Sequence, residues 1–172
     1  MTSAKKIIIE AFLHMLSEQD SEELSVKEIA GKAGVSRSTF YLHFTDKYEL
    51  MEEVRHQLNG RLLHIYAEAS APEAINLKIC RHIFTYRSFY RQEFSDANRI
   101  HQLSGRLANQ LAHAFGDEDL AVFAGWGTIG YLVAWVKGGF LIGPQQAADK
   151  LMKIISADWT ASLAQARGRV SS

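Results

Sequence analysis

Apolar residues recur along almost the whole chain at intervals of three and four, the spacing of one face of an α-helix. The first such stripe predicts a helix over residues 3 to 19 and consists of Ile8, Phe12, Met15 and Leu16. A second stripe, between Leu50 and Ile65, predicts a long helix from about Asp46 to Ala69 that ends near Pro72. No segment alternates apolar and β-branched residues with polar ones over the length of a strand, so the predicted fold class is all-α.

The second half of the chain continues this pattern. Pro72 suits the first turn of a helix whose apolar stripe runs from Ile75 to Tyr90, and a further stripe runs from Ile100 to Phe115. After a break at Gly116 the chain stays largely apolar until Pro144 opens a last helix. We therefore expect an N-terminal domain over residues 1–48, joined by the long helix to a helical domain over residues 49–172.

Residues 24 to 50 carry the most informative local pattern, LSVKEIAGKAGVSRSTFYLHFTDKYEL. Ser25 and Glu28 have the spacing of a capping box, which starts a short helix. Gly34 suits the left-handed residue that ends a helix, and Ser36 suits the N-cap of another helix immediately after it. Two short helices joined by a tight glycine-containing turn form a helix-turn-helix unit. The alternative, two capped helices without a binding role, does not explain why the second helix offers a guanidinium, two hydroxyls, a phenol and an imidazole.

The run GVSRSTFYLHFTDKYEL resembles the signature of the TetR/AcrR family of bacterial transcriptional regulators, and the resemblance covers about residues 5 to 55. The later segments SFYRQEF and GYLVAWVKGGFLIGPQQAADKL resemble a branch common in Firmicutes that includes the regulator of dihydroxyacetone kinase operons. The resemblance implies a homodimer with two recognition helices in successive major grooves of an operator. It also implies a C-terminal domain that releases DNA when it binds an effector, and repression as the direction of control.

Candidate DNA contacts follow from the position of each residue in this motif. Arg37 begins the recognition helix, where a guanidinium can bind guanine with two hydrogen bonds. Phe40 and Phe44 are expected to be core anchors, and packing is the alternative role for Tyr41. Basic residues near the first turns of the flanking helices suit phosphates. The full predicted set is Lys27, Ser36, Arg37, Ser38, Thr39, Tyr41, His43 and Lys47.

The stretch GWGTIG, from Gly125 to Gly130, matches the G-x-G-x-x-G pattern of dinucleotide-binding turns. Such a turn needs further βαβ units, and only one helix follows. We instead expect a helix whose small residues let another helix approach closely, either its neighbour or its symmetry mate. The resemblance to the TetR/AcrR family implies a dimer interface formed by the last two helices of each subunit. The predicted interface residues are Gly127, Gly130, Ala134, Trp135, Gly138, Leu151, Ile155 and Trp159.

The effector site is less constrained by the sequence. We expect a pocket between the long helix and those that follow, lined by His82, Tyr86, Tyr90, His101 and Trp126; the alternative for each is an ordinary helix-face or core role. No H-x-x-x-H or H-E-x-x-H pair is present, so no metal site is predicted. The single cysteine, Cys80, is expected in the core and excludes an intramolecular disulfide.

The amino-acid composition of the chain limits the classes of function that it can have. Nineteen basic residues balance nineteen acidic ones, so a nucleic-acid partner must be recognised by a local surface. Residues 1 to 50 are slightly acidic, which lowers the affinity expected of one head for DNA. We expect a cytoplasmic regulator with double-stranded DNA as partner, no catalytic residues, no cofactor and no membrane span. The alternatives are a regulator controlled by a partner protein and an all-α enzyme, for which no nucleophile-base pair is found.

Overall fold

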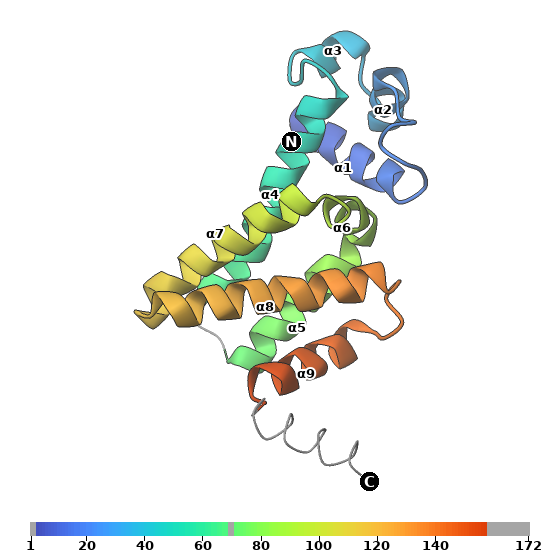
Figure 1. The fold of residues 1–172 in the computed structure, drawn as a ribbon. Coiled ribbons are helices and arrows are strands. Elements are labelled where there is room, and N and C mark those ends of the chain that lie inside the picture. Colours follow the sequence, from blue (N-terminus) through green and yellow to red (C-terminus); the bar gives the residue numbers. More distant parts are fainter. Residues whose placement is uncertain (1–2, 69–70, 158–172) are drawn as a thin grey trace.

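The structure is a computed structural model that describes residues 3–68 and 71–157 (Figure 1). Over these residues it contains helices and no strand, which confirms the predicted fold class. The helices in chain order are α1 (Ala4–Leu16), α2 (Val26–Ala33), α3 (Arg37–Tyr41), α4 (Lys47–Ala67), α5 (Pro72–Thr85), α6 (Arg87–Glu93), α7 (Ala97–Phe115), α8 (Glu118–Lys137) and α9 (Pro144–Ile155).

Helices α1, α2 and α3 form a compact head at one end of the molecule, and α4 runs from this head into the remaining helices, which we call the body (Figure 1). Ile8 and Phe12 of α1 are buried in the head together with Leu50 of α4. The same buried cluster continues along α4 through Leu62 and reaches α5 at Ile79. Because α4 contributes to both ends of one core, it couples the position of the head to the packing of the body.

In the body, α7 and α8 pack along each other, and α5 packs against α9 (Figure 1). Gly125 lies where α8 comes closest to α7: a Cβ atom added to it would lie 2.8 Å from the backbone nitrogen of Ala108. This contact is too short for a carbon atom, so glycine is required here for the two helices to approach. The glycine-rich segment is therefore helical, as predicted, and is not a phosphate-binding turn; Gly125 is its packed glycine, whereas Gly127 and Gly130 are exposed.

The apolar stripe from Ile75 to Tyr90 does not lie on one helix, because the chain breaks at Tyr86 between α5 and α6. In a continuous helix, His82 and Tyr90 would be about 12 Å apart along the axis. The break turns α6 back, and the Tyr90 hydroxyl lies 2.8 Å from His82 Nε2. The hydrogen bond between these two buried side chains depends on this change of direction.

Helix α8 is long and apolar enough to cross a membrane, judged by length and composition alone, and it is the one such helix among the described residues. A core helix of a soluble protein passes the same test. The absence of a membrane span therefore stays a prediction.

Candidate nucleic-acid interface

The helix-turn-helix forms through the caps that the sequence predicts. The Ser25 side chain accepts a hydrogen bond from the Glu28 amide while the Glu28 carboxylate accepts one from the Ser25 amide at 2.9 Å, so the capping box is complete. The Ser25 hydroxyl also donates to the Glu28 carboxylate at 2.6 Å, and the hydrogen bonds from the Ser25 hydroxyl and amide lower the pKa of the Glu28 carboxyl. Gly34 has φ 67° and ends α2, and the Ser36 hydroxyl caps α3 by accepting from the Thr39 amide at 3.0 Å. Only glycine adopts the Gly34 conformation without strain, so the turn between α2 and α3 is fixed locally.

The apolar side of α3 anchors this short helix to the head. Phe40 and Phe44 are buried, with ring centroids 5.7 Å apart, and both belong to the core cluster that contains Ile29 and Ala30 of α2. The predicted role of the two phenylalanines as core anchors is confirmed. A helix of five residues has little stability of its own, so its orientation depends on these contacts.

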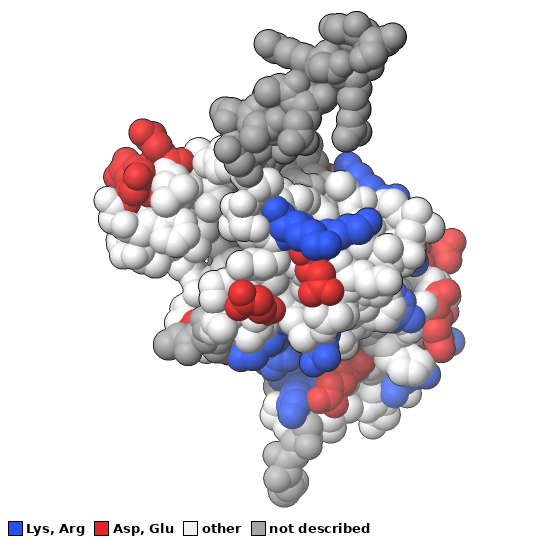
Figure 2. All heavy atoms as spheres, turned by 90° about the horizontal axis from the view of Figure 1, so that it is seen from below, with Lys and Arg blue, Asp and Glu red and all other residues white. Residues whose placement is uncertain are grey.

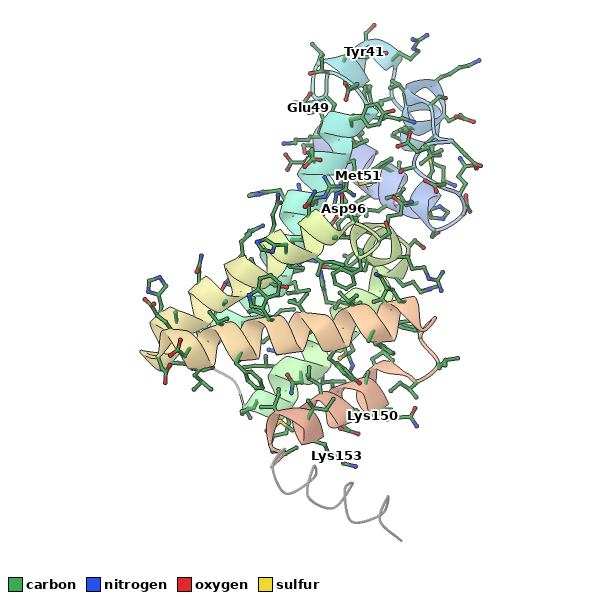
Figure 3. The ribbon with its side chains drawn as sticks, viewed as in Figure 1. Tyr41, Glu49, Met51, Asp96, Lys150 and Lys153 are labelled. Atoms are coloured by element: carbon green, nitrogen blue, oxygen red, sulfur yellow. The ribbon has the colours of Figure 1, made fainter. Side chains whose placement is uncertain are left out.

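The opposite side of α3 faces solvent at the end of the head farthest from the body, where Figure 3 labels Tyr41. Arg37, Ser38 and His43 are exposed, and Tyr41 is 49% exposed. Lys27 is exposed on α2. Among the described residues, neither Arg37 nor Lys27 has an acidic group within ion-pair distance. Both cations are therefore unneutralised and available to an anionic partner.

Two members of the predicted set have a structural task at the cap. The hydroxyls of Ser36 and Thr39 lie 2.8 Å apart, and Thr39 is half-buried. Their side chains organise the start of α3, which presents the Arg37 guanidinium next to them. Their participation in DNA contacts remains a prediction.

Lys47 is placed differently from the sequence-based expectation. Its ammonium donates hydrogen bonds to the carbonyl oxygens of Ser21 at 3.1 Å and Glu22 at 2.8 Å, and its side chain is largely buried. The side chain turns towards the loop between α1 and α2, where these two carbonyl groups accept its hydrogen bonds. In this arrangement Lys47 ties the loop to α4 and does not offer its charge to a phosphate.

One exposed residue of this surface was missed. Leu42, at the end of α3, is 81% exposed although leucine is normally found in the core. The sequence does contain a signal for it, because Leu42 is two residues from Phe40 and from Phe44, and so cannot share their buried side. An exposed leucine beside Tyr41 gives the polar surface an apolar tip suited to a thymine methyl group.

The five residues predicted to line one effector pocket fall into two separate groups. His82 and Tyr90 are buried, with the His82 ring also 3.1 Å from the Leu58 carbonyl oxygen. Burial, together with the smaller effect of the nearby Arg61 charge, lowers the pKa of His82 to about 4, against the opposite effect of the Leu58 hydrogen bond. Burial raises the pKa of Tyr90. Both side chains are therefore neutral structural partners in the core.

The second group lies between α7 and α8, where the rings of His101 and Trp126 meet edge to face with centroids 4.9 Å apart. The prediction of one pocket shared by all five residues is corrected, because α6 and α7 place the two groups on different helix pairs. Tyr86 lines two open hollows of the surface beside α4, and His82 lines one of them. Among residues 3–68 and 71–157 no group of histidine, cysteine or acidic side chains is arranged to hold a metal ion.

The predicted interface residues divide between surface and core. Gly127, Gly130, Ala134 and Gly138 are exposed along one side of α8, and Ile155 is exposed on α9. Trp159 lies outside the described residues.

Two residues of that set are corrected. Trp135 is buried, donates a hydrogen bond from Nε1 to the Ile142 carbonyl oxygen at 3.0 Å, and packs against Phe84 and Phe140. Leu151 is buried where α9 covers α5. Both complete the core of their own subunit, because Trp135 packs against Phe84 of α5 and Leu151 lies on the face of α9 that covers α5.

Comparison with known proteins agrees with the helix-turn-helix. Residues 8–54 match the family model described as bacterial regulatory proteins, tetR family. Over 52 residues the chain is 42% identical to the HTH-type transcriptional regulator YxbF of Bacillus subtilis (strain 168). That match covers 30% of this chain and 14% of the relative, so the chain spans a small part of that protein.

Similar solved structures cover the body as well as the head. A transcriptional regulator of the TerR/AcrR family from Aquifex aeolicus VF5 has a TM-score of 0.71 at 19% identity, with 89% of this chain and 99% of that chain covered. The dihydroxyacetone kinase operon activator DhaS has a TM-score of 0.66 at 18% identity, with 88% and 93% covered. At these identities the similarity is one of fold, and the assignment to the branch of the dihydroxyacetone kinase regulator stays a prediction.

Proposed function

We propose that this chain, whose residues 8–54 match the tetR family of bacterial regulatory proteins, is a member of that family and acts as a homodimeric repressor that binds a palindromic operator and releases it when an effector binds the body. The observation that carries the proposal is the exposed polar side of α3, with Arg37 unneutralised at its first position. Caps fix the turn before α3, and Phe40 fixes its rotation, so the side chains are preorganised for a groove of DNA. Repression as the direction of control is carried over from the family resemblance.

Each residue has a defined task in this proposal. The Arg37 guanidinium reads a guanine with two hydrogen bonds, a contact that contributes about 1 to 3 kcal/mol of discrimination. Tyr41, Leu42 and His43 extend the contact along the groove and reach phosphates or a thymine methyl group. Lys27 binds a phosphate from α2, which positions α3 without selecting a sequence.

Dimerisation through α8 is supported by its exposed side. Gly127, Gly130 and Ala134 present little bulk there, and they are flanked by Leu120 and Trp126, which are 51% and 40% exposed. Small residues between larger apolar ones let a second helix approach closely, and burial of such a strip stabilises a dimer. Two heads held by one dimer can reach half-sites about one helical turn apart.

Selection of bound duplexes from a random DNA library tests the proposal. The library is offered to the wild-type protein, to Arg37→Ala and to Lys150→Ala, each at two salt concentrations. Lys150 lies on α9 in the body, away from the head (Figure 3), so its variant is a control for the loss of one positive charge. We expect a palindromic site for the wild type and for Lys150→Ala, weaker binding at high salt, and loss of the site with Arg37→Ala. Enrichment of the same site by Arg37→Ala would contradict the proposed contact.

Control by a partner protein is the alternative to a small effector, and it uses the same head. A different polypeptide that co-purifies with the chain at a fixed ratio, and that changes operator binding when it is added back, would favour this alternative. A purified chain whose operator binding responds to a small molecule alone would favour the effector.

A further inference from the structure

Two neighbouring hollows open on the surface where the head meets the body. One, of about 580 Å³, lies between α1 and α4, and the other, of about 450 Å³, lies between α4 and α5. Arg61 of α4 and Tyr86, at the junction of α5 and α6, line both of them. The two hollows are therefore adjacent, and we refer to them together as the Arg61 groove.

The lining of the Arg61 groove is rich in cations. Its basic side chains are Lys5, Lys6, Arg61, Lys78 and Arg81, and its acidic ones are Glu10 and Glu68. Both acids are already paired, Glu10 with Lys6 at 3.7 Å and Glu68 with Lys78, and Lys5 is paired with Glu53 at 3.0 Å outside the lining. Within the part of the chain that the structure describes, Arg61 and Arg81 have no acidic partner within ion-pair distance. Two guanidinium groups of one groove thus remain uncompensated.

The groove also has an apolar component. Ile9, Leu13 and Leu58 line its α1 side, and Ile65 lines its α5 side together with the Tyr86 ring. His82 also lines the α5 side, where its buried ring is neutral at pH 7. The positive charge is therefore concentrated on the two arginines, next to apolar side chains that suit a hydrocarbon portion of a ligand.

We propose that the Arg61 groove binds an organic oxyanion, a carboxylate or a phosphate carried on a short apolar body, with Arg61 and Arg81 binding the oxyanion. A guanidinium offers paired N–H donors that match the oxygens of either group. The regulatory part of this inference, that the bound oxyanion changes operator binding, rests on the proposed function. Because the walls of the groove come from α1 of the head and from α4 and α5, an occupant contacts both head and body and restricts the angle between them.

Binding is tested by titration calorimetry on the full chain with four eight-carbon probes that differ only in the head group: octanoate, octyl phosphate, 1-octanol and octylammonium. We expect at least one anion to bind about tenfold more tightly than the alcohol, with the ammonium weakest. The comparison of octanoate with octyl phosphate identifies which oxyanion the groove prefers. Equal affinity for the anions and the alcohol would overturn the proposal.

Variants locate the site. Arg61→Gln and Arg81→Gln should each weaken binding of the preferred anion about tenfold, whereas Arg106→Gln, which removes an exposed arginine of α7 outside the groove, should leave it unchanged. All three positions are exposed, so the variants should fold, and circular dichroism checks this. Unchanged anion binding in the Arg61→Gln, Arg81→Gln double variant would overturn the assignment.

Operator binding, measured with and without the preferred anion, separates the site from its regulatory use. A protein that binds the anion but selects no operator would reject the proposed function and leave the site standing. A protein that selects an operator but binds neither anion would reject the site and leave the proposed function standing. Anion binding that leaves operator affinity unchanged would reject the regulatory part.

Discussion

Arg55 of α4 donates a hydrogen bond from Nε to Glu93 Oε2 of α6 at 2.8 Å, and Glu93 is only 2% exposed. The other oxygen of the same carboxylate accepts from Asn59 Nδ2 at 2.8 Å, and Arg99 of α7 lies 3.9 Å away. Three helices therefore converge on one buried negative charge. Its partners Arg55 and Arg99 line a hollow together with Phe12 of the head, so the pairing of this charge fixes the position of α4 relative to α6 and α7 next to the contact between head and body.

We predict that Arg55→Ala lowers the free energy of unfolding by about 3 kcal/mol, because it leaves the Glu93 carboxylate buried with one distant cation. Glu52→Ala is the matched control, since it removes the exposed partner of the same arginine and should cost less than about 1 kcal/mol. Urea unfolding measures both. Adding Glu93→Gln to Arg55→Ala should recover part of the loss, and equal costs for the two single variants would contradict the buried-charge explanation.

Two glycines of the α7 and α8 pair should respond in opposite directions to alanine. Gly125→Ala brings a methyl group within 2.8 Å of the Ala108 backbone, so the helices must separate and the protein should lose stability. Gly105→Ala meets no atom within 4 Å and should stabilise α7 by up to about 1 kcal/mol, because alanine is the better helix former. Thermal unfolding measures the change in stability of each variant. If Gly125→Ala were stabilising, the approach of the two helices would not be limited by this contact.

Acid should destabilise the protein through His82. Its folded-state pKa is about 4 and its unfolded-state pKa is about 6.5, so the unfolded chain binds more protons between these values. The free energy of unfolding should fall as the pH drops from about 6.5 to about 4, by up to about 3 kcal/mol in total. Urea unfolding across this range measures the slope.

The His82→Gln variant should have a shallower dependence on pH than the wild type, because glutamine does not titrate and can still hydrogen-bond Tyr90. His113→Gln removes an exposed histidine and should leave the slope unchanged. Parallel curves for wild type and His82→Gln would show that another group carries the acid sensitivity.

The proposed dimer predicts that Gly130→Leu is monomeric in solution. A Cβ atom added to Gly130 meets no atom within 4 Å, and the position is exposed, so the subunit should fold while the approach of a second α8 is blocked. Light scattering during gel filtration gives the mass, and Lys32→Leu, which adds an exposed leucine on α2 of the head, should keep the wild-type mass. A dimeric mass for Gly130→Leu would place the interface elsewhere.

Figure 2 shows the face opposite to the head, with basic and acidic side chains interspersed over it. This distribution agrees with the balanced composition and argues against a second extended DNA-binding surface on this face. The proposed DNA contacts lie at the other end of the molecule, around α3.

The sequence by itself determined the features that depend on neighbouring residues. Ser25 with Glu28, Gly34 and Ser36 fix the ends of α2 and α3, because capping and left-handed backbone geometry act within a few residues. The same locality explains why the exposure of Arg37 and the burial of Phe40 could be predicted from one short motif.

The tertiary structure decided which helix covers each apolar face and where long polar side chains end. The periodicity of the sequence places Trp135 and Leu151 on apolar helix faces. It does not show whether such a face packs against α5 of the same subunit or against a second subunit. Lys47 turns to loop carbonyls that are more than twenty residues away in the chain, and Glu93 meets Arg55 only because α6 folds back at Tyr86. Such contacts depend on the directions of whole helices, which no local pattern of residues specifies.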